Sequence, residues 1–593
     1  MRTLVAVVAI LLAASADWAA EPGDAKSRLN AIIAEAWEGA LADTPLLATA
    51  VGDHRYDDKL PDVSPASLER QAQRERGWLQ GLRAIDRSAL ATADRINLDL
   101  LALRLDESIH SFGLGAQRLP ITSDSGFHTE LVRLPEEVPL ADLRNYENYL
   151  ARLRAIPAYF DQQIAWLREG LRAGFTLPRV VLDGYDATIR AHAETTAEGS
   201  VFMAPFASFP PGVPEARRER LRAEAREAIG GAVIPAYRRL LEFMTRDYIP
   251  GARASIAAAE LPNGRPYYAW LVRHYTTLDR TPEEVHRAGL DEVRRIRAEM
   301  EAVIKKTGFE GTFAEFLRFL RTDPRFYAKT PEELLERAAW IAKRMDGKLP
   351  ALFRRFPRQP YGVEPVPADL APKYTAGRYV GAPLEGTRGG TYWVNTHALE
   401  SRSLYTLEAL TLHEAVPGHH FQIALAKELT DIPAFRRHDY IDAFGEGWGL
   451  YSERLGLEVG FYTDPYSDFG RLTYEMWRAC RLVVDTGIHA FGWTREKAID
   501  YLASNSALSL HEVTTEIDRY ISWPGQALAY KTGEMEIRRL RRLAEDALGE
   551  RFDVRAFHDA LLENGALTLP LLAERIDAFI AKSESEHSSE ESP

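Results

Sequence analysis

The sequence predicts a mainly α-helical protein with a small β-sheet, and three observations support this fold class. Apolar residues recur at helical spacing along most of the chain, for example at positions 29, 32, 33, 36 and 37. Helix start signals recur as well, since Thr281 and Thr330 are each followed by a proline and two glutamates. Clear strand signals are confined to residues 360–396.

The N-terminus has the pattern of a cleavable secretory signal. Arg2 precedes an apolar run at residues 4–14, and a small-x-small site follows at residues 14–16. We therefore assign residues 1–16 to a signal peptide, with cleavage as late as residue 20 as an alternative, and expect a periplasmic or secreted protein. The other interpretation is an uncleaved anchor. Because the run is shorter than the ~20 residues that span a bilayer, we expect no stable membrane insertion after cleavage.

The next part of the chain is expected to form an N-terminal helical region at residues 25–360. Its boundary lies where proline and glycine cluster between helical segments. Periodicity predicts helices at residues 28–50, 66–82, 94–111, 140–173, 214–245 and 281–307.

A second region, residues 361–580, is expected to begin with the strands. Residues 360–367 and 378–383 are short and bounded by proline, whereas residues 391–396 follow two glycines and are rich in β-forming residues. The end of the chain, residues 583–593, contains no apolar residue, which predicts a disordered acidic tail.

Composition and charge exclude several classes of protein. The 593 residues are 46% hydrophobic and 27% charged, which is inconsistent with a largely disordered or fibrous chain. The formal net charge of −13 argues against nucleic acid as a partner, because phosphate contacts need clustered Lys and Arg. Cys480 is the only cysteine, so the fold must depend on its hydrophobic core rather than on an internal disulfide.

Residues 411–422 carry three histidines and a glutamate on a predicted helix with apolar flanks. In an HExxH helix of a zinc peptidase, two histidines four residues apart share one face and bind one zinc ion, while the glutamate faces the attacking water. His413 and Glu414 fit this pattern, but Pro417 stands where the second histidine would be.

The second ligand must therefore come from a distorted helix. An unbroken helix would place His420 about 10.5 Å along the axis from His413, which is too far for both to bind one ion comfortably. Pro417 removes a helix hydrogen bond and Gly418 tolerates unusual dihedral angles, so a bulge that absorbs two residues would bring His419 into place. We predict His413 and His419 as ligands, with His420 as the alternative. The competing interpretation is three histidines that cap or pack against a kink.

Three segments carry a resemblance to a known family: HEAVPGHH at residues 413–420, EGWGLYSE at residues 446–453 and PGQALAYK at residues 524–531. They resemble the signatures of a bacterial family related in outline to the helical gluzincin peptidases, such as angiotensin-converting enzyme, thimet oligopeptidase and Taq carboxypeptidase. The resemblance covers about residues 28–580. It implies a large helical body with a deep cleft, to which residues 25–360 contribute, and a small edge β-sheet near a metal site.

The resemblance also implies a zinc ion and a third ligand, a glutamate on a following helix. Glu446 has the spacing expected after a two-residue insertion, and Glu453, two turns further on, is the alternative ligand or an orienting partner. Glu414 would activate the zinc-bound water and pass its proton to the leaving amine. Tyr530 is the first candidate and Tyr520 the second for stabilising the oxyanion.

Substrate-binding residues are predicted on two segments. Asn395 lies in the strand at residues 391–396, which by resemblance is an edge strand that pairs with an extended peptide. Arg519 and Lys531 are candidates for a substrate carboxylate, because charged hydrogen bonds to such groups are strong.

A charged stripe formed by Arg478, Arg481, Asp485 and His489 has two interpretations. Either these residues form a buried ion network, or Asp485 hydrogen-bonds a ligand histidine and orients it.

The sequence thus predicts an exported zinc-dependent hydrolase, a metallopeptidase that cleaves short peptides. One alternative is a metal-bearing periplasmic protein that binds peptides without cleaving them. Another is a zinc amidase or esterase acting on other substrates. The presence of Glu414 beside His413 favours catalysis, because a structural metal site would not need that base. The oligomeric state is not predicted.

Overall fold

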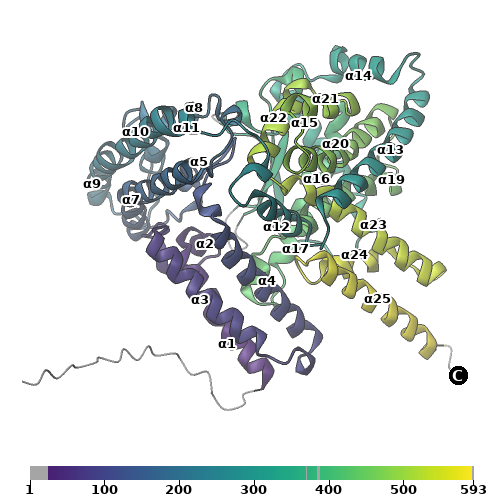
Figure 1. Ribbon diagram of the computed structural model, residues 1–593, viewed down its shortest axis with the longest axis horizontal. Coiled ribbons are helices and arrows are strands. Elements are labelled where there is room, and N and C mark those ends of the chain that lie inside the picture. The colour runs from purple at the N-terminus through teal and green to yellow at the C-terminus, as the bar shows by residue number, and fades with distance from the viewer. Residues whose placement is uncertain (1–23, 369, 383–387, 591–593) are drawn as a thin grey trace, which may run out of the picture.

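A computed structural model describes residues 24–368, 370–382 and 388–590 of the chain (Figure 1). It confirms a mainly α-helical fold with a small three-stranded sheet. The predicted signal peptide at residues 1–16 lies outside the described residues. Within the described residues, no helix combines the length and apolar character needed to cross a membrane.

The helices of the first 251 residues form the left side of the molecule in Figure 1. The helix predicted at residues 28–50 is broken at Thr44, because Pro45 disfavours a helical conformation in the residue before it. The helix predicted at residues 214–245 extends to Gly251 through two π-helical segments, η6 (Ile229–Val233) and η7 (Met244–Tyr248). The helices are α1 (Ala25–Asp43), α2 (Pro45–Ala50), α3 (Pro65–Arg83), α4 (Thr92–Leu114), α5 (Phe127–Val132), α6 (Leu134–Glu137), α7 (Leu143–Ala173), α8 (Asp186–Ala193), α9 (Glu215–Ala228), α10 (Ile234–Phe243) and α11 (Ile249–Gly251).

The rest of the chain packs around one long helix, α20. Every residue from Phe469 to His489 of this helix is buried, and α13 and α16 pack along it. A helix covered on all sides lies at the centre of a protein. The helices of this part are α12 (Gly264–Thr276), α13 (Pro282–Thr307), α14 (Phe313–Thr322), α15 (Pro331–Asp346), α16 (Leu404–Glu414), α17 (His419–Lys427), α18 (Ala434–Arg437), α19 (Asp442–Glu458), α20 (Pro465–His489), α21 (Arg495–Asn505), α22 (Leu510–Ser522), α23 (Ala529–Leu548), α24 (Val554–Leu562) and α25 (Leu569–Glu590).

The sheet has the strand order β1-β3-β2 and lies against α16 and α17. Strand β1 (Tyr361–Pro365) runs parallel to β3 (Gly390–Val394), and β2 (Gly377–Val380) runs antiparallel to it. All three predicted strands are present. The one predicted to be an edge strand, β3, is the central strand, because both of the others pair with it. The edge that contacts α16 and α17 is β2.

One main hydrophobic cluster runs from Ile96 to Ile576 and includes residues on both sides of the boundary predicted near residue 360. The end of the chain differs from the prediction. Helix α25 continues to Glu590, so residues 583–590 of the predicted disordered tail are helical, and residues 591–593 lie outside the described residues. Extending an existing helix adds one hydrogen bond per residue without a new nucleation step, so a polar segment can continue a helix that packs through its earlier residues.

Candidate metal centre

The segment that carries the histidines is two helices rather than one bulged helix. Helix α16 ends at Glu414 and α17 begins at His419, with a non-helical link at residues 415–418 that contains a cis Val416–Pro417 peptide bond. The predicted bulge is therefore wrong in form. Its expected effect, the approach of His419 to His413, is present, because the link folds back on the end of α16.

Two contacts of the link explain this fold. A Cβ atom on Gly418 would lie 1.9 Å from the His413 carbonyl oxygen, so only glycine allows the backbone to come this close. The carbonyl of Pro417 accepts a hydrogen bond of 2.8 Å from the Trp448 indole Nε1, which ties the link to α19. The position of His419 is thus fixed from two sides.

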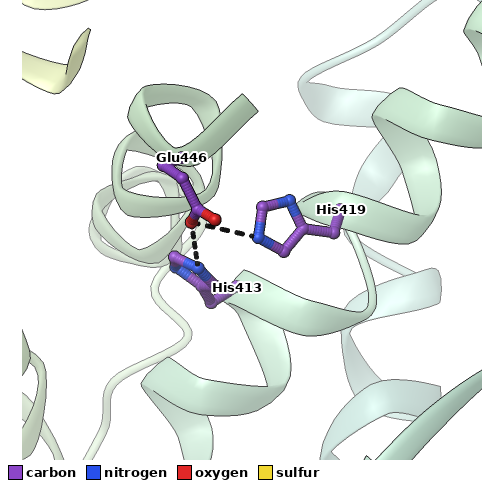
Figure 2. Close-up of side chains that lie close together, drawn as sticks. All are labelled: His413, His419 and Glu446. Carbon is purple, nitrogen blue, oxygen red and sulfur yellow. Dashed lines mark ion pairs between the residues drawn. The ribbon is translucent and has the colours of Figure 1, made fainter. Parts of the chain in front are cut away.

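The side chains of His413, His419 and Glu446 converge from three helices, α16, α17 and α19 (Figure 2). Glu446 Oε2 lies 3.5 Å from His413 Nε2 and 3.4 Å from His419 Nε2, and the two imidazole rings are nearly perpendicular. These are the three residues predicted as metal ligands, and we call them the ligand triad.

The ligand triad fits a zinc ion in both chemistry and spacing. Two imidazole nitrogens and a carboxylate oxygen are a common zinc donor set, and bonds of about 2.1 Å at tetrahedral angles separate ligand atoms by about 3.4 Å. One ligand atom from each residue lies within 4.8 Å of the other two. Glu446 Oε2 is buried, and no described residue gives it a hydrogen bond. A cation between the three groups would satisfy this oxygen.

Glu453 lies behind His413 and orients its imidazole ring. Glu453 Oε1 lies 2.9 Å from His413 Nδ1, and Arg478 Nη2 lies 3.5 Å from the same oxygen. Glu453 is therefore a partner of a ligand and not a member of the ligand triad. Burial opposes a charge on His413, but the adjacent carboxylates of Glu446 and Glu453 outweigh it and raise the pKa of His413 to about 9. The carboxylates thus favour positive charge at this position.

Glu414 is held by the edge strand. Its Oε2 accepts a hydrogen bond of 2.8 Å from the backbone N–H of Tyr379 in β2. The alternative ligand His420 points elsewhere, since its Nδ1 lies 3.1 Å from the Tyr379 hydroxyl and its ring packs on Tyr361. Burial lowers the pKa of His420 to about 4. His420 therefore helps to join α17 to the sheet and does not face the ligand triad.

The two candidate tyrosines have different surroundings. The ring of Tyr530 is stacked 6.4 Å from that of His413, and Gln526 Nε2 lies 3.5 Å from its hydroxyl. The Tyr520 hydroxyl accepts hydrogen bonds from Trp477 Nε1 at 2.8 Å and Arg481 Nε at 2.7 Å, deep in the core. Tyr530 is thus the one beside the ligand triad.

Two residues predicted to bind substrate have structural roles instead. Asn395 is fully buried, and its Nδ2 atom lies within 3.1 Å of the carbonyls of Ala371, Tyr374 and Thr375, where it holds the loop before β2. Lys531 is also fully buried among carboxylates. Arg519 remains partly exposed, with hydrogen bonds to Glu516 and Gln526.

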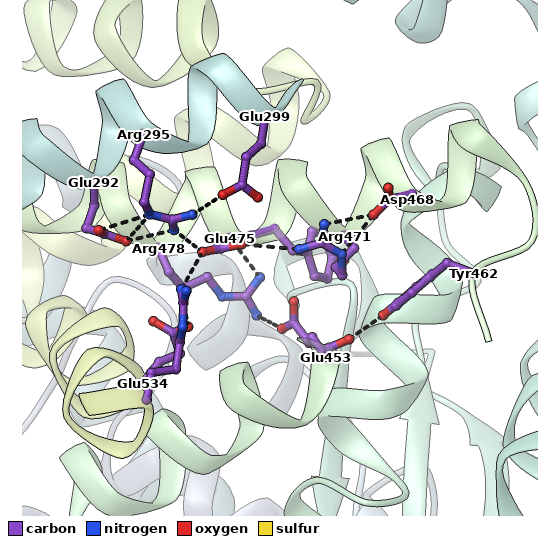
Figure 3. Close-up of polar contacts among 12 residues, drawn as sticks. Glu292, Arg295, Glu299, Glu453, Tyr462, Asp468, Arg471, Glu475, Arg478 and Glu534 are labelled. Carbon is purple, nitrogen blue, oxygen red and sulfur yellow. Dashed lines mark hydrogen bonds and ion pairs between the residues drawn. The ribbon is translucent and has the colours of Figure 1, made fainter. Parts of the chain in front are cut away.

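Lys531 belongs to a buried network of charges. Its carboxylate partners Glu292, Glu475 and Glu534 are labelled in Figure 3. Its Nζ lies 2.8 to 2.9 Å from Glu292, Glu475 and Glu534, which come from α13, α20 and α23. These carboxylates could together surround a metal ion, but the ammonium group of Lys531 already lies between them. Arg295 and Arg471 add ion pairs to Glu475.

The predicted charged stripe on α20 is a buried network rather than a source of ligand orientation. Asp485 accepts hydrogen bonds from the Tyr268 hydroxyl and from Gly525 N, so it does not contact a histidine of the ligand triad. His489 Nδ1 accepts from Ala258 N, and its Nε2 lies 2.9 Å from the Tyr520 carbonyl. On this stripe Arg478 connects to the site through Glu453, and the guanidinium carbon of Arg481 lies 4.1 Å from the centre of the Tyr530 ring.

Sequence reasoning missed three residues near the site. The Tyr379 N–H that holds Glu414 is a backbone group, which no side-chain pattern reveals. The ring of Tyr440 lies 6.5 Å from that of His419, and its side chain is exposed. Arg378 is exposed on β2, next to Tyr379. For Arg378, the sequence offered one signal: it lies in a predicted strand that precedes the segment with the three histidines.

Comparison with known proteins gives a family and a fold. The family described as "Bacterial protein of unknown function (DUF885)" matches residues 45–576. The structure of "the putative lipoprotein from Colwellia psychrerythraea" is similar at 27% identity and a TM-score of 0.88, over 94% of this chain and 100% of that chain. The structure of "a putative lipoprotein of unknown function from Shewanella oneidensis" has the same fold, at 18% identity and a TM-score of 0.63, over 93% of this chain and 99% of that one. No curated protein matches the chain.

Proposed function

The chain belongs to the bacterial DUF885 family, and from its site we propose that it is an exported, single-zinc hydrolase that cleaves amide bonds in short peptides. The observation that carries this proposal is the ligand triad with a glutamate next to its first histidine. His413, His419 and Glu446 would hold the ion, and Glu414 lies directly beside His413 in the chain. The resemblance of HEAVPGHH to the gluzincin motif supports the same interpretation.

The chemistry divides between the ion and the chain. Zinc, when bound, supplies a Lewis acid that lowers the pKa of water and polarises a carbonyl group. Glu414 would take the proton from the attacking water and deliver it to the leaving amine. The hydrogen bond from Tyr379 N fixes Oε2 of Glu414, so the carboxylate is already oriented before substrate arrives.

Two further groups would act on the substrate. The Tyr530 hydroxyl is our candidate donor to the oxyanion, because its ring stacks on His413 and its hydroxyl lies close to Gln526. Glu453 would keep His413 in one tautomer by accepting from Nδ1, so that Nε2 is the metal-binding nitrogen.

The location is proposed from two sources. The N-terminal residues carry a secretory signal pattern, and a structure with 27% identity belongs to a protein named as a lipoprotein. We infer an exported protein of the periplasm or cell envelope, or one released from the cell.

A mixed peptide library tests the proposal. The purified, zinc-loaded protein should cleave members of the library, and a chelator should stop cleavage until zinc is restored. Bound zinc with tight peptide binding but no cleavage would instead indicate a binding protein. Cleavage of esters or non-peptide amides alone would indicate a zinc amidase or esterase instead of a peptidase.

Glu414→Gln tests the catalytic step itself. This variant should keep one zinc ion per chain and lose at least ~10²-fold in kcat/KM, the scale of general-base catalysis. Glu458→Gln, on an exposed ion pair of α19, is the control and should remain active. Full activity of Glu414→Gln with zinc bound would remove Glu414 from the mechanism.

A further inference from the structure

Arg378 lies in the edge strand β2, beside the candidate site, and its charged side chain is exposed. In this strand Gly377 and Tyr379 are buried while Arg378 is exposed, as the alternation of a strand requires. The next residue, Tyr379, donates its N–H to Glu414. The guanidinium carbon of Arg378 lies 5.3 Å from the centre of the Tyr374 ring, which supports one side of it. Arg378 is thus the neighbour in sequence of Tyr379, the residue whose backbone N–H holds Glu414.

The groups that act on Arg378 come from four separate parts of the chain. Burial of its surroundings works against the charge, but Tyr374, Asp124, Tyr530 and Glu414 outweigh this and raise the pKa of Arg378. Two of these, Glu414 and Tyr530, are the residues assigned to proton transfer and to the oxyanion. The exposed side chain of Arg378 thus projects from the strand that holds Glu414, on the face opposite to the buried ring of Tyr379.

Arg378 differs from the other arginines near the site. Arg478 pairs with Glu453, Arg481 with Glu516, and Arg519 with Glu516. Within the residues that the structure describes, no carboxylate forms an ion pair with Arg378. A guanidinium that has no ion-pair partner among the described residues is available to bind an anion from a ligand. The planar guanidinium is suited to bind a carboxylate through two parallel hydrogen bonds.

We propose that Arg378 binds the C-terminal carboxylate of the substrate, so that the substrates are peptides with a free C-terminus and cleavage occurs within their last few residues. The inference rests on the proposed function and adds the substrate class to it. A peptide held at both the ligand triad and Arg378 would have its scissile carbonyl placed beside Glu414. Peptides with a blocked C-terminus would lose this anchor.

Matched pairs of N-acetylated hexapeptides test the inference. Each pair has one sequence, once as the free acid and once as the C-terminal amide. The zinc-loaded wild-type protein should cleave the acids with a kcat/KM at least about 10-fold higher, the scale of a charged hydrogen bond. Arg378→Gln should remove the difference between the members of a pair, and Arg378→Lys should restore part of it. Arg358→Gln, an exposed arginine before β1, is the control and should keep the full difference.

A binding measurement separates the two proposals. In zinc-loaded Glu414→Gln protein, calorimetry should show tighter binding of the acid than of the amide, and adding Arg378→Gln should remove that preference. If the wild type cleaves peptides without preferring acids, or if Arg378→Gln keeps the preference, the inference is wrong and the proposed function stands. If no peptide is cleaved, the proposed function fails, and the calorimetry alone decides whether Arg378 selects a carboxylate.

Discussion

At the scale of single residues, His413 is the most constrained member of the ligand triad. Glu453 fixes its Nδ1 atom, and Tyr530 stacks on its ring. A Cβ atom on Gly449 would lie 2.7 to 3.0 Å from the imidazole, so the glycine provides the space that the ring occupies. His419 has fewer contacts, and its Nδ1 is buried without a hydrogen bond from the described residues. The fold itself thus fixes the position and orientation of the first histidine.

This difference leads to a prediction about Glu453. Glu453→Gln removes the negative charge behind His413 while keeping the size of the side chain, so zinc affinity should fall about 10- to 100-fold. A competition titration with a zinc-sensitive dye measures the change. The matched control is Glu458→Gln, five residues further along α19, where the carboxylate pairs with Arg541 at the surface. Equal affinities of the two variants would show that Glu453 does not support the metal.

The ligand triad could be predicted residue by residue, whereas its supports could not. Histidine and glutamate at the right spacing restrict where a metal can bind, so His413, His419 and Glu446 were found from the sequence. The hydrogen-bonding partner of Asn395 is a set of backbone carbonyls, and Lys531 meets carboxylates from distant helices. Such partners depend on tertiary packing that local sequence does not contain.

At the scale of elements, the link between α16 and α17 decides which histidine joins His413 and Glu446 in the ligand triad. Residues 415–418 leave the helix, return close to the end of α16, and restart a helix at His419. The sequence showed that Pro417 and Gly418 must interrupt the helix. It could not distinguish a bulge from a break, because that choice depends on contacts such as Trp448 Nε1 to the Pro417 carbonyl.

Gly418→Ala tests the close approach within the link. The added methyl group would meet the His413 and Leu412 carbonyls, so the link must move and take His419 with it. The free energy of unfolding should fall by about 1–3 kcal/mol, as for other overpacked sites, and zinc affinity should fall as well. Urea unfolding and dye competition measure the two effects.

Gly77→Ala is the matched control for this change. Gly77 lies within helix α3, and no neighbouring atom lies within 4 Å of the place that an added methyl group would take. Alanine should stabilise the helix by about 0.5–1 kcal/mol and leave zinc binding unaltered. If Gly418→Ala behaves in the same way, the close approach does not determine the position of His419.

At the scale of the whole molecule, the buried charge network joins the helices behind the site. Lys531 from α23 lies between carboxylates of α13 and α20, and it is fully buried. Glu475 is held strongly ionised, because burial is outweighed by Lys531, Arg295 and Arg471, which keep its pKa well below the usual range. The same central helix, α20, supplies Arg478 to Glu453. The network and the ligand triad therefore share one framework.

Lys531→Met should destabilise the whole fold. It leaves the carboxylates of Glu292, Glu475 and Glu534 without their shared cation, and breaking a buried pair in this way costs about 3–5 kcal/mol. Chemical denaturation measures the loss. Lys343→Met, at a largely exposed surface pair, is the control and should change stability by less than about 0.5 kcal/mol. A small effect of Lys531→Met would mean that the network adds little to stability.

The most direct test of the account is the zinc stoichiometry and affinity of single variants of the three predicted ligands and of the neighbouring histidine. The wild-type protein should bind one zinc ion per chain, and His413→Ala, His419→Ala and Glu446→Ala should each abolish tight binding. His420→Ala should bind one ion as the wild type does, because His420 faces Tyr379 and Tyr361. Tight zinc binding that survives His419→Ala and is lost in His420→Ala would contradict the account.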